Sequence, residues 1–177
     1  MITAIREMLP ADVERVVDYF VQATQDFLRG MGADKSKLPE RANWIERIKH
    51  ELDIPFDQKE IYYVIWQVDG RAIGHSNVNQ IEFGKHASMH LHIWESKDRQ
   101  GGNGLDLVRQ TIPIYFDKFR LEKLICEPYA LNPAPNRALE KVGFEFIRSY
   151  ETIPGIICFH QLVNRYEMSR IRFDEVN

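Results

Sequence analysis

Apolar residues recur at helical spacing early in the chain and alternate with polar residues in its middle, which indicates helices followed by strands. A hairpin is expected where two β-branched and aromatic segments, 61–68 and 72–83, flank Asp69-Gly70, a dipeptide typical of tight turns. Gly30 and Gly32 are expected to end the first long helix. The expected strands are 2–8, 61–68, 72–83, 87–95, 121–127, 144–152 and 156–166, and the expected helices begin at Pro10, near Pro39, after Gly104 and at Pro135.

Alternation in the segment 87–95 places His90 and His92 on one face of a strand and apolar residues on the other. The helix that follows contains Pro113, which removes a backbone hydrogen bond and is expected to kink it. Antiparallel hairpins then lead into one βαβ unit, whose crossover should be right-handed. The sequence therefore predicts a single domain over residues 1–177 of mixed α/β (α+β) class. Its sheet should be seven-stranded and mostly antiparallel, with helices on both faces.

Composition excludes several classes of protein. The 177 residues carry a formal net charge of −3, so no strong field would attract nucleic acid. The longest apolar runs, such as 61–66, are too short to span a bilayer, and residues 1–6 lack the features of a signal peptide. Cys126 and Cys158 form no CxxC pair, which argues against a disulfide scaffold or a zinc module. We expect a cytoplasmic monomer or homodimer without a metal, which binds neither nucleic acid nor membranes.

A glycine-rich loop separates the strand 87–95 from the next helix. Glycines let backbone N–H groups turn toward a ligand, a helix N-terminus adds partial positive charge, and an arginine adds a full one. Pyrophosphate is therefore the expected ligand, and the alternative is a turn that binds nothing. The loop consists of Arg99, Gln100, Gly101, Gly102, Asn103 and Gly104.

The loop is not a P-loop, because the required lysine and hydroxyl residue are missing. A dinucleotide fingerprint needs a third glycine where this chain has Leu107, although Glu127 lies near the distance expected of a ribose-binding acid. A nucleotide-binding oxidoreductase therefore stays open as an alternative.

Two motifs resemble those of the GNAT N-acetyltransferase family. Arg99-x-x-Gly102-x-Gly104 is similar to the family's coenzyme A motif, (Q/R)xxGx(G/A). The segment 132–144 begins with an asparagine and ends in Glu-Lys-Val-Gly-Phe, which is similar to the family's second signature. The order of expected elements also matches along nearly the whole chain, whereas the N-terminal helices, which build the acceptor pocket in this family, match only in type.

The resemblance implies that acetyl-CoA is the cosubstrate and that the sheet splays between the His90 strand and the Glu127 strand. Pantetheine would lie in that gap, and the side chain of His92 would be a packing or positioning group beside it. The implied coenzyme contacts are the backbone of His92, Ile93 and Trp94, the loop Arg99, Gln100, Gly101, Gly102, Asn103 and Gly104, then Asn132, and, near the adenine and 3′-phosphate, Asn136 and Arg137.

Acetyl transfer to an amine needs a base for the ammonium proton and an acid for the departing thiolate. Glu127 is the first candidate base, because it ends an apolar strand where a carboxylate is costly unless it is paired or useful. Its place before Asn132 also resembles an acidic active-site position of several GNAT subfamilies. The alternative is a structural carboxylate that caps a loop or pairs with an arginine.

His90 is the second candidate base, and it should then produce a pH limb near neutrality. It matches the second of two alternating histidines in arylalkylamine acetyltransferases, while Ser88 stands at the first position. A structural histidine is the alternative. The general acid is unassigned, because Leu139 stands where many family members carry a tyrosine, and Tyr129 and Tyr150 are among the candidates.

The acceptor is expected to be a small polar molecule with a primary amine or a hydroxylamine-type nitrogen. The segments 89–92 and 125–128 resemble siderophore-biosynthesis acetyltransferases, which acylate a hydroxylysine side chain. The acidic-proline step at Glu127 also resembles aminoglycoside 6′-acetyltransferases. A protein N-terminal acetyltransferase of the ribosomal-protein type and a non-catalytic acyl-CoA-binding module are the alternatives.

Overall fold

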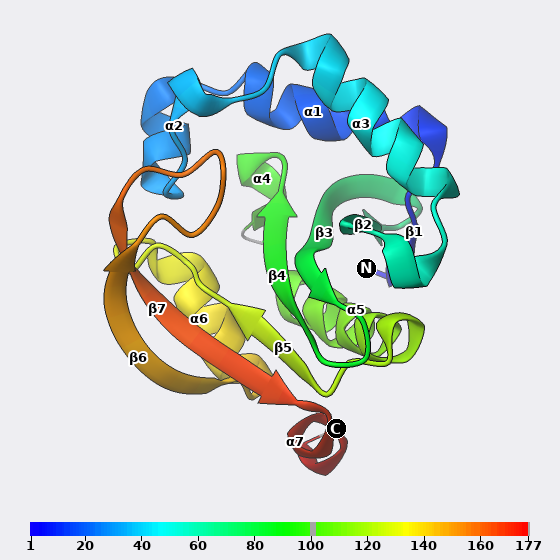
Figure 1. Cartoon of the computed structure of the whole chain (residues 1–177), viewed down its shortest axis with the longest axis vertical. Coiled ribbons are helices and arrows are strands. Elements are labelled where there is room, and N and C mark those ends of the chain that lie inside the picture. Colours follow the sequence, from blue (N-terminus) through cyan, green and yellow to red (C-terminus); the bar gives the residue numbers. More distant parts are fainter. Residues whose placement is uncertain (100–101, 177) are drawn as a thin grey trace.

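The computed structural model describes residues 1–99 and 102–176 and has one seven-stranded sheet in the order β1-β2-β3-β4-β5-β7-β6 (Figure 1). All neighbouring strands are antiparallel except β4 and β5. The strands are β1 Thr3–Glu7, β2 Ile61–Val68, β3 Arg71–Glu82, β4 His86–Ile93, β5 Lys123–Cys126, β6 Glu145–Thr152 and β7 Gln161–Ser169. The helices are α1 Val13–Val21, α2 Gln25–Gly30, α3 Arg41–Asp53, α4 Ser96–Arg99, α5 Gly104–Phe119, α6 Pro133–Val142 and α7 Arg170–Val176, with short 3₁₀ turns η1 Pro10–Asp12, η2 Lys35–Lys37 and η3 Phe56–Gln58.

The predicted hairpin joins β2 to β3. Asp69 and Gly70 have φ angles of 48° and 78°, so both central residues adopt the left-handed conformation that a tight two-residue turn requires. Strand β2 carries side chains alternately into two layers of core. Trp66 packs with the α5 side and donates its indole N–H to Thr111 at 2.9 Å, whereas Ile65 packs with α1 and α3. The mixed α/β fold with helices on both faces is confirmed.

Strands β4 and β5 diverge. In the described part of the chain their pairing covers His86, Ala87 and Ser88 of β4; β5 ends at Cys126 while β4 continues to Ile93, and in Figure 1 the two strands point apart. On their outer edges, β4 pairs with β3 and β5 pairs with β7, so the short β4–β5 pairing alone joins the two halves of the sheet. The helix α5 connects β4 to β5 and lies behind the sheet in Figure 1. The sheet therefore opens along the second half of β4, between the His90 strand and the Glu127 strand.

A long connection between β6 and β7 closes one side of this opening. Its residues Ile157 and Cys158 accept hydrogen bonds of 2.8 Å from the Asp34 backbone and from the Lys37 ammonium. Gln161 donates to the Gly32 carbonyl at 2.7 Å. In Figure 1 this orange connection meets the segment that follows α2.

Several predicted boundaries are wrong. The first helix divides into α1 and α2, because Thr24 is extended (φ −69°, ψ 155°) and its hydroxyl caps α2 at the Phe27 N–H. Residues 156–160 belong to the β6–β7 connection, so β7 starts at Gln161. The C-terminal helix α7 was not predicted from the sequence. Helix α5 runs through Pro113 as one helix.

Within residues 1–99 and 102–176, no helix is both long enough and apolar enough to cross a membrane.

Candidate active site

The structure describes Gly102, Asn103 and Gly104 of the glycine-rich loop. Gly102 has a φ of +72°, and no described heavy atom lies within 4 Å of the place that a Cβ would take. Gly104 begins α5, and no described side chain caps the first turn of that helix after Asn103. These N–H groups are therefore open to an anionic ligand. Gln100 and Gly101, also expected to bind the coenzyme, lie outside the described residues.

Arg99 turns back onto the end of β4. Its guanidinium donates to the Ile93 carbonyl at 3.1 and 3.2 Å and lies 4.7 Å from the ring centroid of Phe27 in α2. The side chain is exposed, so a pyrophosphate could draw it away from these partners. Arg99 thus joins the glycine-rich loop to the helix layer that covers the other face of β4.

The free edge of β4 lies beside the opening of the sheet. On its other edge, β4 is paired with β3 through His92 and Ile93, and the Trp94 N–H donates to the Ile73 carbonyl at 2.9 Å. Because the β5 pairing ends at Ser88, no described strand pairs with this edge of β4 near Ile93, and an extended amide chain could lie there once Arg99 releases the Ile93 carbonyl.

Glu127 follows β5 and is part of an ion-pair network. One carboxylate oxygen accepts hydrogen bonds from the Tyr150 hydroxyl and, at 2.8 Å, from Arg165. Arg165 also pairs with Glu167 at 2.7 Å, and Glu167 pairs with Lys123 at 2.9 Å. The side chain of Glu127 is 18% exposed, so the carboxylate is enclosed but reachable. Arg165 is thus the arginine partner expected if Glu127 is a structural carboxylate.

Burial lowers the pKa of His90 to about 4, although the nearby charge of Glu127 raises it in part. A pKa this low does not favour the expected pH limb near neutrality for His90, whose imidazole is neutral at pH 7. Its Nε2 lies 3.0 Å from the side-chain oxygen of Asn79 on β3. With so low a pKa, the neutral imidazole is a weak base at pH 7.

His92 packs in an aromatic cluster. It stacks on His75 with a centroid separation of 4.8 Å, and burial lowers its pKa well below the usual value. His75 accepts a 2.8 Å hydrogen bond from the Trp94 indole, and burial lowers its pKa to about 3. Tyr19 and Phe20 of α1 cover the His92 ring. The side chain of His92 is thus placed for packing, while its backbone borders the opening.

Asn132 and Asn136 mark the start of α6. Asn132 precedes the first turn of the helix, and no described side chain caps that turn. Asn136 is 7% exposed, and its amide N–H groups donate to the carbonyls of Tyr129 and Asn132 at 3.1 and 2.6 Å, while its oxygen accepts from Asn164. Asn136 therefore holds the turn that presents Asn132. Leu139 is 1% exposed and belongs to the core.

Three contacts of the candidate bases were not predicted from the sequence. Arg165 and Tyr150 contact Glu127, and Asn79 contacts His90. Alternation does place Asn79 and His75 on one face of β3, which is a signal that the sequence carries. Arg165 gives no such signal, because its proximity to Glu127 depends on β7 lying between β5 and β6.

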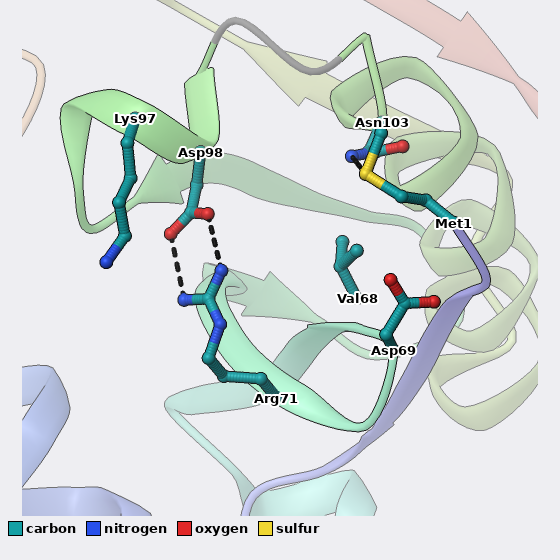
Figure 2. Close-up of a pocket in the computed structure, with 7 residues that line it drawn as sticks. All are labelled: Met1, Val68, Asp69, Arg71, Lys97, Asp98 and Asn103. Carbon is teal, nitrogen blue, oxygen red and sulfur yellow. Dashed lines mark hydrogen bonds and ion pairs between the residues drawn. The ribbon is translucent and has the colours of Figure 1, made fainter.

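A pocket of ≈ 400 Å³ lies beside Asn103 of the glycine-rich loop (Figure 2). Figure 2 shows Asp98 of α4 facing Arg71 of β3 in a two-pronged ion pair, with N–O distances of 2.6 and 3.1 Å. Asn103 lies across the pocket near Met1. In residues 1–99 and 102–176, no group of three His, Cys, Asp or Glu side chains is arranged to hold a metal ion.

Similar solved structures share this fold. A spermidine N-acetyltransferase from Vibrio cholerae, in complex with CoA and spermine, superimposes with a TM-score of 0.78 at 13% identity, covering 97% of both chains. The aminoglycoside acetyltransferase AAC(6′)-Ib, in complex with coenzyme A and kanamycin, gives 0.73 at 16% identity over 98% of both chains. RimL, a ribosomal L7/L12 alpha-N-protein acetyltransferase, gives 0.74 at 12% identity over 94% of this chain and 93% of that one.

No curated protein sequence matches the chain significantly. A family model does: the acetyltransferase (GNAT) domain matches residues 3–145. This range contains the diverging strands, the glycine-rich loop and α6. The chain belongs to the GNAT acetyltransferase family.

Proposed function

We propose that this GNAT acetyltransferase moves an acetyl group from acetyl-CoA directly to a primary amine, or a hydroxylamine-type nitrogen, of a small molecule. The observation that carries the proposal is the free second half of β4 next to the uncapped start of α5. The CoA-bound relatives of the same fold, crystallised with spermine and kanamycin, support it. We further propose that the enzyme works in the cytoplasm, as a monomer or homodimer.

The residues present fit acetyl-CoA. We propose that the N–H groups of Gly102 and Gly104 and the side chain of Arg99 hold the pyrophosphate, because no described side chain caps this start of α5 and the Arg99 side chain is exposed. The backbone from His92 to Trp94 would pair with pantetheine, and Asn132 would meet its amides from α6. When bound, the coenzyme supplies the activated acetyl thioester.

The protein must manage two protons in the transfer. The amine nitrogen forms a bond to the acetyl carbonyl carbon and loses one proton, while the carbon–sulfur bond breaks and the thiolate gains one. Glu127 and the neutral imidazole of His90 are the proposed acceptors of the amine proton. Burial and the hydrogen bond to Glu127 raise the pKa of Tyr150, which makes its hydroxyl a weaker acid, so we propose that it gives a proton to the thiolate only as Glu127 passes on the proton taken from the amine.

The coenzyme site is tested by Gly104→Val. In the structure a Cβ at Gly104 meets only the Ile93 side chain among the described residues, at 3.6 Å, so the fold tolerates it. The added side chain lies where phosphate must approach the backbone, so acetyl-CoA affinity should fall at least about tenfold, roughly 1.4 kcal/mol. Calorimetry on folded protein measures this, with Gly30→Val as the matched control, since no described heavy atom lies within 4 Å of a Cβ there.

Unchanged affinity in Gly104→Val would refute the coenzyme site. Thiol release from acetyl-CoA in an amine screen then separates an enzyme from a binding module, because only transfer liberates the free thiol.

A further inference from the structure

Two arginines face each other across the strands β6 and β7. The register of the two strands places Arg148 opposite Arg165, and like charges in directly opposite positions destabilise a sheet. Arg165 is compensated by the carboxylates of Glu127 and Glu167 at 2.8 and 2.7 Å. Within residues 1–99 and 102–176, no carboxylate pairs with Arg148. The charge of Arg148 is therefore not needed to balance this network.

The phenol ring of Tyr150 is the partner of Arg148. The two residues lie two positions apart on β6 and so share a face of the strand, and the guanidinium carbon lies 4.6 Å from the ring centroid. The Tyr150 hydroxyl donates to Glu127, and the same carboxylate oxygen accepts from Arg165 at 2.8 Å. The phenol thus lies between two guanidinium groups, one over its ring and one beside its hydrogen-bond acceptor.

The groups that face this phenol act on its proton in opposite directions. Glu127, Arg148 and Arg165 face the ring from the end of β5, from β6 and from β7, and Tyr129 lies one strand further away, behind a valine of β7 that is opposite Tyr150. Burial and Glu127 raise the pKa of Tyr150, whereas Arg165 lowers it. Arg148 acts in the same direction as Arg165, because a cation over the ring attracts a phenolate more strongly than a neutral phenol.

We infer that Arg148 is a positioning residue of the transfer reaction, which acts through Tyr150 by stabilising the negative charge that develops on the phenol as this tyrosine protonates the leaving thiolate. The inference rests on the proposed acetyl transfer and deepens it. The O–H bond of Tyr150 breaks as the S–H bond of the thiol forms. Glu127 passes to the phenol oxygen the proton that it took from the amine, so the carboxylate and the phenol are both restored.

The first test compares Arg148→Gln, which removes the charge, with Arg148→Lys, which keeps it. With acetyl-CoA and butylamine, a plain primary amine, Arg148→Gln should lower kcat about two- to fivefold, the size of an exposed cation–π contact, and leave KM for acetyl-CoA nearly unchanged. Arg148→Lys should retain most of the parent kcat. Arg120→Gln removes an exposed guanidinium 5.9 Å from the ring of Phe83, and as the matched control it should change neither quantity.

A ring-fluorinated tyrosine in place of Tyr150 separates this role from a structural one. The fluorinated phenol keeps the ring and the hydroxyl but is a stronger acid, so it depends less on a nearby cation. Its fluorine NMR signal also reports the titration of the phenol in the absence of any acceptor. In this background Arg148→Gln should move the titration midpoint to higher pH, because the phenolate loses a favourable charge. The loss of kcat should be smaller than with the natural tyrosine.

Two results would overturn the role of Arg148 while leaving acetyl transfer standing. One is a titration midpoint or a kcat that Arg148→Gln leaves unchanged. The other is an equal loss of kcat with the natural and the fluorinated tyrosine, which would mean that Arg148 only supports the strand. Failure of acetyl-CoA to bind the parent protein in calorimetry would instead overturn the proposed function itself, and with it the basis of the inference.

Discussion

The carboxylate of Glu127 lies at one end of a chain of alternating charges. Arg165 of β7 bridges it to Glu167, which in turn pairs with Lys123 of β5. An enclosed ion pair loses several kcal/mol when one partner is removed, because the other charge is left without compensation. Arg165 retains Glu167 when Glu127 is neutralised, so the charge at Glu127 can be changed with limited damage to the fold.

Glu127→Gln should lower turnover about a hundredfold or more and leave acetyl-CoA affinity nearly intact. The amide keeps the shape of the side chain but cannot accept the amine proton, and a general base contributes about 10²- to 10⁴-fold to rate. Steady-state kinetics with a saturating acceptor, together with calorimetry, measure both quantities. The control Arg165→Gln removes the ion pair and keeps the carboxylate, so it should slow the reaction less. Normal turnover in Glu127→Gln would show that the carboxylate is structural and would make His90 the leading base.

The sequence identified the candidate residues better than their surroundings. Glu127 at a strand end and His90 by alternation follow from local patterns, because strand periodicity is a property of consecutive residues. The Arg165 contact requires β7 to lie next to β5, and the Asn79 contact requires a particular register of β3 against β4. Register and strand order depend on long-range packing, which local patterns do not encode.

The short helix α4 is held from both faces of the sheet before it enters the glycine-rich loop. Asp98 pairs with Arg71 at the start of β3, and its side chain is only 11% exposed. Just before α4, Glu95 pairs with Arg15 of α1 at 3.0 Å. A two-pronged arginine–carboxylate pair fixes orientation as well as distance. The Arg71–Asp98 pair therefore sets the direction in which α4 delivers Arg99 and the loop.

Asp98→Arg should weaken acetyl-CoA binding about three- to tenfold. Without the ion pair the glycine-rich loop is less ordered in the free enzyme, so part of the binding free energy is used to order it. The double variant Arg71→Asp/Asp98→Arg restores the pair with its charges exchanged and should recover most of the affinity. Calorimetry measures both, and kcat at saturating acetyl-CoA should stay near that of the parent. Arg170→Gln removes the Asp117–Arg170 ion pair at 2.6 Å and is the control, with no expected effect on affinity. Equal losses in the single and double variants would show that the pair does not position the loop.

At the scale of elements, the sequence predicted the strands β1 to β6 and the starts of the helices α3, α5 and α6 to within a few residues. Their signals are local: a hairpin turn at Gly70, a proline before α3 and a left-handed Gly143 after α6. The break at Thr24 escaped prediction, because apolar spacing continues across it while the threonine caps a new helix. The β6–β7 connection escaped it as well, since residues 156–160 are apolar enough for a strand but dock on the segment after α2.

The whole molecule encloses a layer of neutral histidines between the sheet and α1. His75 and His92 stack on each other, and His75 has an Nε2 that is buried without a hydrogen-bond partner among the described residues. Tyr19 packs on both rings, and burial raises its pKa to about 12, so this part of the interior carries no charge at neutral pH. The positive charge of Arg99 further lowers the pKa of His92.

This layer should make the fold sensitive to acid. The three histidines, His75, His90 and His92, have folded-state pKa values lowered by burial, to about 3 for His75 and about 4 for His90. Unfolding exposes them to water, where a histidine titrates near 6.5. Between about pH 6.5 and the lowered pKa values, the unfolded chain binds more protons than the folded one. The free energy of unfolding therefore falls as pH falls, by up to about 1.4 kcal/mol per pH unit for each histidine.

Urea unfolding at several pH values from 7.5 to about 5 measures this dependence of the free energy of unfolding on pH. His92→Phe keeps the stack and should reduce the slope by about one proton, whereas His50→Phe, at an exposed position of α3, should leave it unchanged. The same slope in His92→Phe as in the parent would mean that His92 takes up its proton while folded, and the interior would then admit charge.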